Sequence, residues 1–208
     1  MSKPGSETVY SVHPAVAYSR TIVENLPATT GRSMEEWVAL IEAEGPVGKS
    51  ERRDWLKKEH GLGGTKATMI ATWSVGEGEE DIDPQAYLAA APGMVEALYE
   101  GPKAALRPIH DALLAMALEL GDVRVCPCTT IVPLYRAHVF AQIKPATRKR
   151  VDLGLALKGV REEIPPRVLA TGGLEKGDRI THRIPIETLA EIDDEVRHWL
   201  RVAYDLDG

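Results

Sequence analysis

Cysteine is nearly absent from this chain of 208 residues. Its two cysteines, Cys126 and Cys128, are separated by a single proline. Two thiols in one C-P-C run provide no disulfide framework, and they lack the spacing of a redox C-x-x-C and the four ligands of a structural zinc site. We therefore interpret both as structural cysteines and expect neither a metal nor a cofactor.

Long apolar runs are missing as well. No stretch approaches the roughly 20 apolar residues that span a bilayer. The first residues, MSKPGSETVYSVHP, lack the apolar centre of a secretory signal. Together with the few cysteines, these features predict a cytoplasmic protein that does not associate with membranes. The net charge of −6 argues against a protein that coats nucleic acid non-specifically.

Several catalytic motifs are also lacking. Every serine lies at or before Ser74, so no serine nucleophile can be built in the second half of the chain. The sequence contains no G-x-S-x-G, no G-x-x-x-x-G-K-[ST] and no H-E-x-x-H, and no G-x-G-x-x-G follows a predicted strand. These absences remove the usual signals for acyl transfer, nucleotide hydrolysis and redox chemistry with a dinucleotide. Whether the protein is an enzyme stays open, and the balance favours a protein that is not.

The first half of the chain has the pattern of short helices. A helix is predicted over residues 14–24, and Ser33 with Glu36 three residues later forms a capping box for the next. Ser50 is expected to cap a third helix, and a fourth begins near Thr65. Three of the four tryptophans lie in this region, which is enough to seed a small core. We predict a helical domain over residues 1–75.

An acidic segment follows. Residues 76–84 contain five carboxylates and two glycines but only one large apolar residue. This composition is typical of a solvated connection. We predict a linker over residues 76–93.

The second half changes from helical spacing to strand spacing and back. Apolar residues step by three and four over 106–120 and again over 189–203, which predicts two amphipathic helices. Between them the apolar period is two, with a last strand expected near 180–186. This order predicts an α+β fold over residues 94–208, in which two helices cover the apolar face of an antiparallel sheet. The residues expected to be buried in the central strands are Val139, Ile143, Leu153, Leu155 and Leu157.

Two segments resemble known families. The runs TGRSMEEWVALIEAEGP and WLKKEHGLGGTKATMIA, within residues 30–71, are similar to domain of unknown function 4287. The runs GPKAALRPIHDALLA, IKPATRKRVDLGLALKG and WLRVAYD, within residues 101–205, resemble domain of unknown function 5655. The families bring no established activity, so the resemblance implies only a bacterial cytosolic protein with this order of domains.

The densest positive charge lies between residues 131 and 158. Most of it falls in the connection between two predicted strands, where it could form an anion site with basic residues of the polar sheet face. The alternative is a solvated loop whose charges keep a sheet edge from pairing with other chains. The predicted ligand-binding residues are Arg136, His138, Lys144, Arg148, Lys149, Arg150, Lys158 and Arg183. The leading hypothesis is a non-enzymatic binding or accessory protein for an anionic small molecule or an acidic protein partner.

A glycine-rich run supports a second hypothesis. Residues 61–67, GLGGTKA, have the spacing of a helix-hairpin-helix turn. In such a turn the glycines allow a tight bend, and free N–H groups of the next helix bind a phosphate. The alternative is a tight turn that joins two packed helices. A nucleic-acid-associated protein would use Gly61, Gly63, Gly64, Thr65 and Lys66.

Histidine supports a third hypothesis, a small-molecule enzyme with a histidine base. His182 lies between Ile180 and Ile184 on the predicted apolar face, and His138 follows a predicted strand. A histidine that is hydrogen-bonded inside the fold or at its edge is the alternative.

Overall fold

The computed structural model describes residues 10–208, which divide into two compact units. The smaller unit covers residues 12–90, and the larger holds residues 91–208 together with Tyr10 and Ser11. Each unit has a hydrophobic core of its own. Within the described part of the chain, no helix has the length and apolar character needed to cross a membrane.

The smaller unit is helical. Its capping box is present as predicted, because the Ser33 hydroxyl accepts the Glu36 N–H at 3.2 Å and the Glu36 carboxylate accepts the Ser33 N–H at 2.7 Å. Ser50 does not cap a helix as expected, since that helix begins at Lys49 after Gly48. The elements are α1 (Pro14–Glu24), α2 (Leu26–Thr30), α3 (Met34–Glu44), α4 (Lys49–His60), α5 (Gly64–Trp73) and the 3-10 turn η1 (Glu79–Asp81).

The core of the smaller unit forms around Trp37, which is 2% exposed. Its indole N–H donates to the Thr30 hydroxyl at 2.9 Å, so the polar edge of the buried ring has a hydrogen-bond partner.

Within the acidic segment, the Asp83 carboxylate accepts the Ala86 N–H at 2.8 Å at the start of α6 (Pro84–Leu98). The boundary between the two units falls inside α6.

The described residues of the larger unit form a six-stranded sheet in the order β1-β2-β3-β4-β6-β5. All neighbouring strands are antiparallel. The strands are β1 (Arg124–Val125), β2 (Val132–Tyr135), β3 (Val139–Lys144), β4 (Val151–Leu155), β5 (Leu169–Ala170) and β6 (His182–Ile186). The predicted α+β fold is confirmed.

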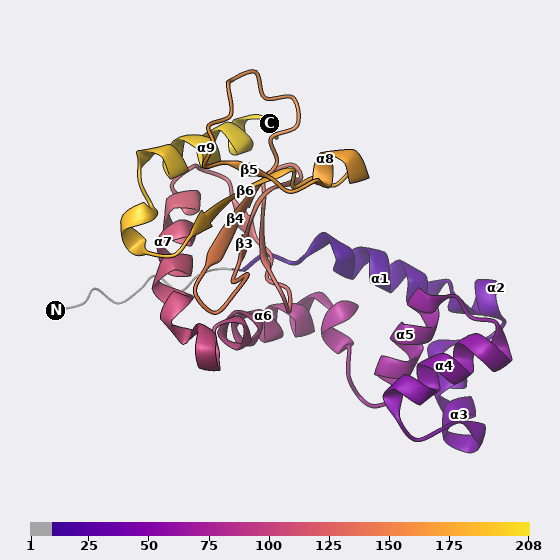
Figure 1. Ribbon diagram of the computed structural model, residues 1–208. Helices are drawn as coiled ribbons and strands as arrows, with labels where there is room; N and C mark the ends of the chain where they lie inside the picture. The colour runs from indigo at the N-terminus through magenta and orange to yellow at the C-terminus, as the bar shows by residue number, and fades with distance from the viewer. Residues whose placement is uncertain (1–9) are drawn as a thin grey trace. The chain divides into compact units, whose positions relative to one another are not determined.

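Two helices cover one face of this sheet. The helices α7 (Arg107–Leu118) and α9 (Asp194–Asp205) both contact β3 and β4, and Figure 1 shows them on the same side of the strands. Pro108 lies in the first turn of α7, where its missing N–H costs nothing. The short elements are η2 (Gly101–Leu106), α8 (Gly173–Lys176) and η3 (Leu189–Glu191). The predicted core residues buried in the larger unit are Ile143, Leu153, Leu155 and Leu157.

Val139 departs from the predicted alternation. The register between β2 and β3 shifts so that Phe140 is an extra residue in β3. Such a bulge changes which side chains face the core. Phe140 is fully buried and packs edge-on against Tyr204 of α9, with ring centroids 5.3 Å apart. The half-buried Val139 instead lines a groove on the other face, so the prediction that it belongs to the core is wrong.

Candidate functional site

The sheet face opposite α7 and α9 carries a shallow groove of about 460 Å³. Three cross-strand partners, Gln142, Gly154 and Arg183, form one row across its floor. Lys144 and Asp152 pair in the next row. We call the surface formed by Gln142, Lys144, Asp152, Gly154 and Arg183 the open face.

Gly154 keeps the floor of the groove low. A Cβ atom at this position would lie 2.7 Å from Cγ of Gln142 and 2.8 Å from Cγ2 of Ile180. Real Cβ atoms do not approach other atoms so closely, so any side chain would push these neighbours apart. Glycine therefore lets Gln142 and Ile180 lie against the backbone of β4.

Arginines share a carboxylate on the open face. Arg150 Nε lies 2.8 Å from Asp152 Oδ1, and the Arg183 guanidinium donates to the same oxygen at 3.1 Å. The Asp152 side chain is only 13% exposed, so it holds both guanidinium groups in place. Lys144 is exposed and has no ion pair among the described residues. Asp178 also lines the groove, so these three cations exceed the two carboxylates by one positive charge.

The remaining residues of the predicted anion set lie elsewhere. Arg148 and Lys149 are exposed in the loop between β3 and β4, which is closed by the Thr147 N–H donating to the Arg150 carbonyl at 3.2 Å. Lys158 is exposed beyond the end of β4 and lines a different cavity. Only Lys144 and Arg183 of the predicted set line the groove itself.

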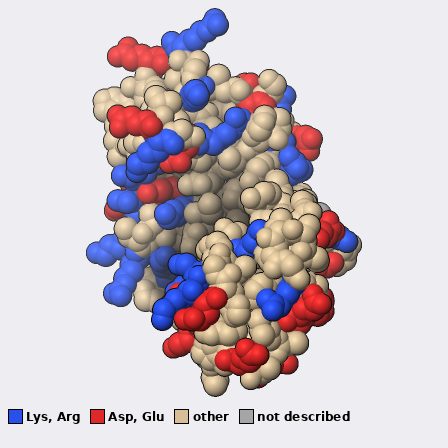
Figure 2. Space-filling view, turned by 90° about the vertical axis from the view of Figure 1, so that its right-hand side faces the viewer, with Lys and Arg blue, Asp and Glu red and all other residues tan. Residues whose placement is uncertain are grey.

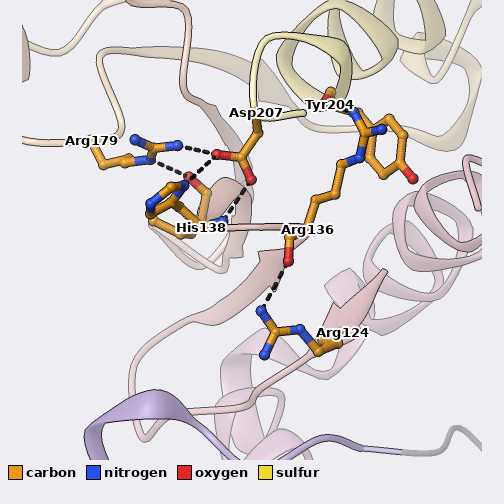
Figure 3. Close-up of polar contacts among 7 residues, drawn as sticks. Arg124, Arg136, His138, Arg179, Tyr204 and Asp207 are labelled. Carbon is orange, nitrogen blue, oxygen red and sulfur yellow. Dashed lines mark hydrogen bonds and ion pairs between the residues drawn. The ribbon is translucent and has the colours of Figure 1, made fainter. Parts of the chain in front are cut away.

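Arg136 and His138 are engaged with the last residues of the chain (Figure 3). The Asp207 side chain is 1% exposed; its carboxylate accepts the His138 N–H at 2.7 Å and lies 3.2 Å from His138 Nδ1. Arg136 donates to the Tyr204 carbonyl at 3.1 Å and stacks over the Tyr204 ring. Neither Arg136 nor His138 lines the groove, so their part in binding an anion stays a prediction.

Arg179 was missing from the predicted set, although it lines the groove. Its Nε donates to the Val139 carbonyl at 3.2 Å, and its guanidinium pairs with Asp207 (Figure 3). Arg179 lies between α8 and β6, in a segment without apolar periodicity. Only the folded chain brings it to β3, so no sequence signal identifies it.

The predicted turn between α4 and α5 is present. Gly61 has a φ of +65° and ends α4, and the Leu62 N–H donates to the Leu56 carbonyl at 3.2 Å. Gly63 and Gly64 have ordinary φ values, and a Cβ at either position would meet no atom within 4 Å. The fold itself therefore requires glycine only at Gly61. At the other two positions, glycine exposes the N–H groups that begin α5.

The histidines of the enzyme hypothesis lie outside the groove. His182 is half-buried in β6, with Nδ1 2.9 Å from the Thr181 hydroxyl, and burial lowers its pKa. His138 is exposed beside Asp207. Burial raises the pKa of Cys126 to about 11, which fits a structural rather than a reactive thiol. Over residues 10–208, no group of three or more His, Cys, Asp or Glu residues is placed to hold a metal.

Comparison with known families matches both units. A family model described as Domain of unknown function (DUF5655) matches residues 95–207. The chain belongs to the DUF5655 family. A second model, Domain of unknown function (DUF4287), matches residues 19–74. The resemblance to both families is thus confirmed, and the DUF5655 match contains every residue of the open face. No curated protein and no solved structure matches the chain.

Proposed function

We propose that this DUF5655 protein is a bacterial cytoplasmic binding protein that holds an anionic small molecule on the open face without transforming it. The observation that carries this proposal is the groove of about 460 Å³ whose rim and floor include Lys144, Arg179 and Arg183. An acidic surface of a partner protein would meet the same three cations.

The arrangement favours binding because two of the cations are held in place before a ligand arrives. Asp152 holds Arg183, and Asp207 together with the Val139 carbonyl holds Arg179. Charge-assisted hydrogen bonds from fixed donors are stronger than those from mobile side chains, because less conformational entropy is lost on binding. The exposed Lys144 adds a further cation that can reach a ligand in the groove.

The distribution of charge also favours a local site. Figure 2 shows Lys and Arg side chains interleaved with Asp and Glu side chains over the face that it draws. Such mixing suits a small ligand that contacts a few cations at short range, because the effects of more distant charges of both signs are screened and cancel.

Calorimetric titration tests the proposal. The wild-type protein is titrated with inorganic phosphate, pyrophosphate, citrate and a nucleoside triphosphate, next to the variants Lys144→Glu and Arg148→Glu. We expect at least one of these anions to bind and Lys144→Glu to weaken it by about tenfold or more, as expected for a lost charged contact plus repulsion. Arg148→Glu reports whether the β3–β4 loop contributes.

Arg161→Glu is the matched control, because Arg161 is exposed and has no ion pair among residues 10–208. It makes the same change in net charge away from the groove lining. Equal affinity in Lys144→Glu, Arg161→Glu and wild type, or no binding of any probe, contradicts the proposal.

A second candidate function is nucleic-acid binding by the turn at residues 61–66. The observation that favours it is that Gly63 and Gly64 are glycines without a steric or conformational need, next to the exposed start of α5. A backbone free of side chains allows a phosphate to approach the N–H groups closely. The half-buried Lys66 lies in the first turn of α5.

This candidate predicts binding of DNA or RNA that weakens as salt rises, because phosphate contacts release counterions. A mobility-shift assay at low salt compares the wild type with Lys66→Glu, and with Arg20→Glu on the exposed surface of α1 as control. A shift that Lys66→Glu abolishes and Arg20→Glu retains supports it. No shift with the wild-type protein removes it.

A further inference from the structure

A second cavity of about 230 Å³ lies beside the groove in the larger unit. It has two small residues, Ala156 after β4 and Ala203 on α9, and two leucines, Leu174 on α8 and Leu206 after α9. Leu174 is 56% exposed and Leu206 is 42% exposed. Two exposed leucines that line the same cavity leave apolar surface that a ligand would remove from water.

Two charged residues of this cavity form an ion pair, and two others do not. Arg179 and Asp207 pair with each other (Figure 3). Lys158 and Asp178 also line the cavity, and neither forms an ion pair within the described part of the chain. The cavity therefore combines apolar walls with one free cation and one free anion.

We propose that this cavity binds a free aliphatic α-amino acid such as leucine. Lys158 would bind the carboxylate, Asp178 the ammonium group, and the two leucines would enclose the side chain. A ligand with a carboxylate but no ammonium group would place its negative charge in the same cavity as Asp178 and repel it. An uncharged apolar ligand would remove water from Lys158 and Asp178 without forming an ion pair with either. The volume lies below the roughly 300 Å³ at which pockets for drug-sized ligands begin, which suits a molecule of this size.

The proposed amino-acid site can be tested separately from the open face, although Asp178 and Arg179 line both cavities. Of the two cavities, Lys158 and Leu174 line only the smaller one, whereas Lys144 and Arg183 line only the groove. A substitution at Lys158 therefore tests the amino-acid site and leaves the open face intact.

The experiment titrates the whole protein with L-leucine, leucinamide and N-acetyl-leucine, and follows binding by calorimetry. Leucinamide lacks the carboxylate and N-acetyl-leucine lacks the ammonium group. We expect leucine to bind with a Kd on the order of 1 mM or tighter, within the limit for so small a ligand. Each analogue should bind about tenfold more weakly, because it loses one charged contact.

The variants assign each contact to a residue. Lys158→Gln should reduce the affinity for leucine to that of the wild type for leucinamide. Its affinity for leucinamide should equal that of the wild type, because the same contact cannot be lost twice. Asp178→Asn should reduce the affinity for leucine to that of the wild type for N-acetyl-leucine, and its affinity for N-acetyl-leucine should equal that of the wild type. Lys144→Gln, the matched loss of one lysine charge at the groove, should leave leucine binding unchanged.

Leu174→Asp tests the apolar wall at an exposed position, where the substitution does not disturb the core. It should weaken leucine and both analogues alike. The inference is overturned if leucine shows no saturable binding, or if Lys158→Gln binds it as tightly as the wild type. N-acetyl-leucine binding as tightly as leucine also overturns it, since that result indicates a peptide carboxyl terminus rather than a free amino acid.

Discussion

The two faces of the sheet are built from alternate residues of the same strands. In β4, Leu153 is fully buried under the helices, whereas its neighbour Asp152 lies on the open face; in β6, Ile184 and Arg183 divide in the same way. One face is packed with aliphatic side chains, and the other has charged groups around a groove. The buried core and the proposed binding surface are thereby separated by one residue along the strand, so a substitution on one face can leave the other intact.

The largest expected effect is on the covered face. Leu153→Ala removes a fully buried side chain at the centre of the sheet and leaves a cavity. We expect the free energy of unfolding to fall by about 2–5 kcal/mol. Urea denaturation followed by circular dichroism measures this loss. A change below about 1 kcal/mol would contradict the role of this face as the core.

Acid should also lower the folding stability, through a buried histidine on the helix-covered side of the sheet. His110 of α7 is 1% exposed, with Nδ1 3.1 Å from the Tyr99 hydroxyl, and burial lowers its pKa to about 4 from the ordinary 6.5. Between these values the unfolded chain binds a proton that the folded chain does not, so stability is full above pH 6.5 and falls as the pH drops towards 4. The loss by pH 4 is about 3 kcal/mol.

Denaturation midpoints measured from pH 7 to pH 4 test this, with His110→Gln as the comparison, since its amide can still bond to Tyr99. Between pH 6.5 and 4, the denaturation midpoint should fall less steeply with decreasing pH in His110→Gln than in the wild type. Equal slopes would show that other groups cause the acid sensitivity.

Asp207 links the two faces, because it follows α9 on the covered side and holds Arg179 of the groove. Asp207→Asn keeps an acceptor for the His138 N–H but loses the charge opposite Arg179. We expect a loss of about 1–2 kcal/mol in stability, since Arg179 is 45% exposed and water replaces part of the interaction. It should also weaken anion binding by releasing Arg179.

Asp205→Asn is the control for this prediction, because Asp205 is exposed two residues earlier. Thermal denaturation and the calorimetric titration are run on both variants. Matching results for the two substitutions would mean that the buried carboxylate does not position Arg179.

The smallest effect on stability belongs to the open face. Lys144→Ala removes an exposed side chain without an ion pair among the described residues, so the free energy of unfolding should change by less than about 0.5 kcal/mol. Urea denaturation checks this beside Leu153→Ala. Destabilisation comparable to that of Leu153→Ala would break the separation of the two faces.

The periodic parts of the fold could be predicted from the sequence, and the irregular parts could not. The alternation in β4 identified Leu153 and Leu155 correctly because a regular strand repeats every two residues. The bulge at Phe140 has no signal in that pattern, so Val139 was assigned to the wrong face.

The candidate site was predicted only in part, for a related reason. Lys144 and Arg183 lie on regular strands, and the folded sheet brings them to one groove. Arg136 and His138 of the predicted set do not line this groove, and contacts with Tyr204 and Asp207, far away in sequence, hold their positions. Contacts of this range depend on the tertiary fold, which local patterns do not encode.

The most direct test of the central claim is a map of amide chemical shifts during titration of the uniformly ¹⁵N-labelled protein with pyrophosphate. If the open face binds the anion, the largest saturable shifts fall at Gln142, Lys144, Gly154 and Arg183, and they are lost in Lys144→Glu. Shifts that gather at residues 61–66 would favour the turn of the smaller unit instead. Shifts that do not saturate, or that persist unchanged in Lys144→Glu, would contradict the assignment of function to the open face.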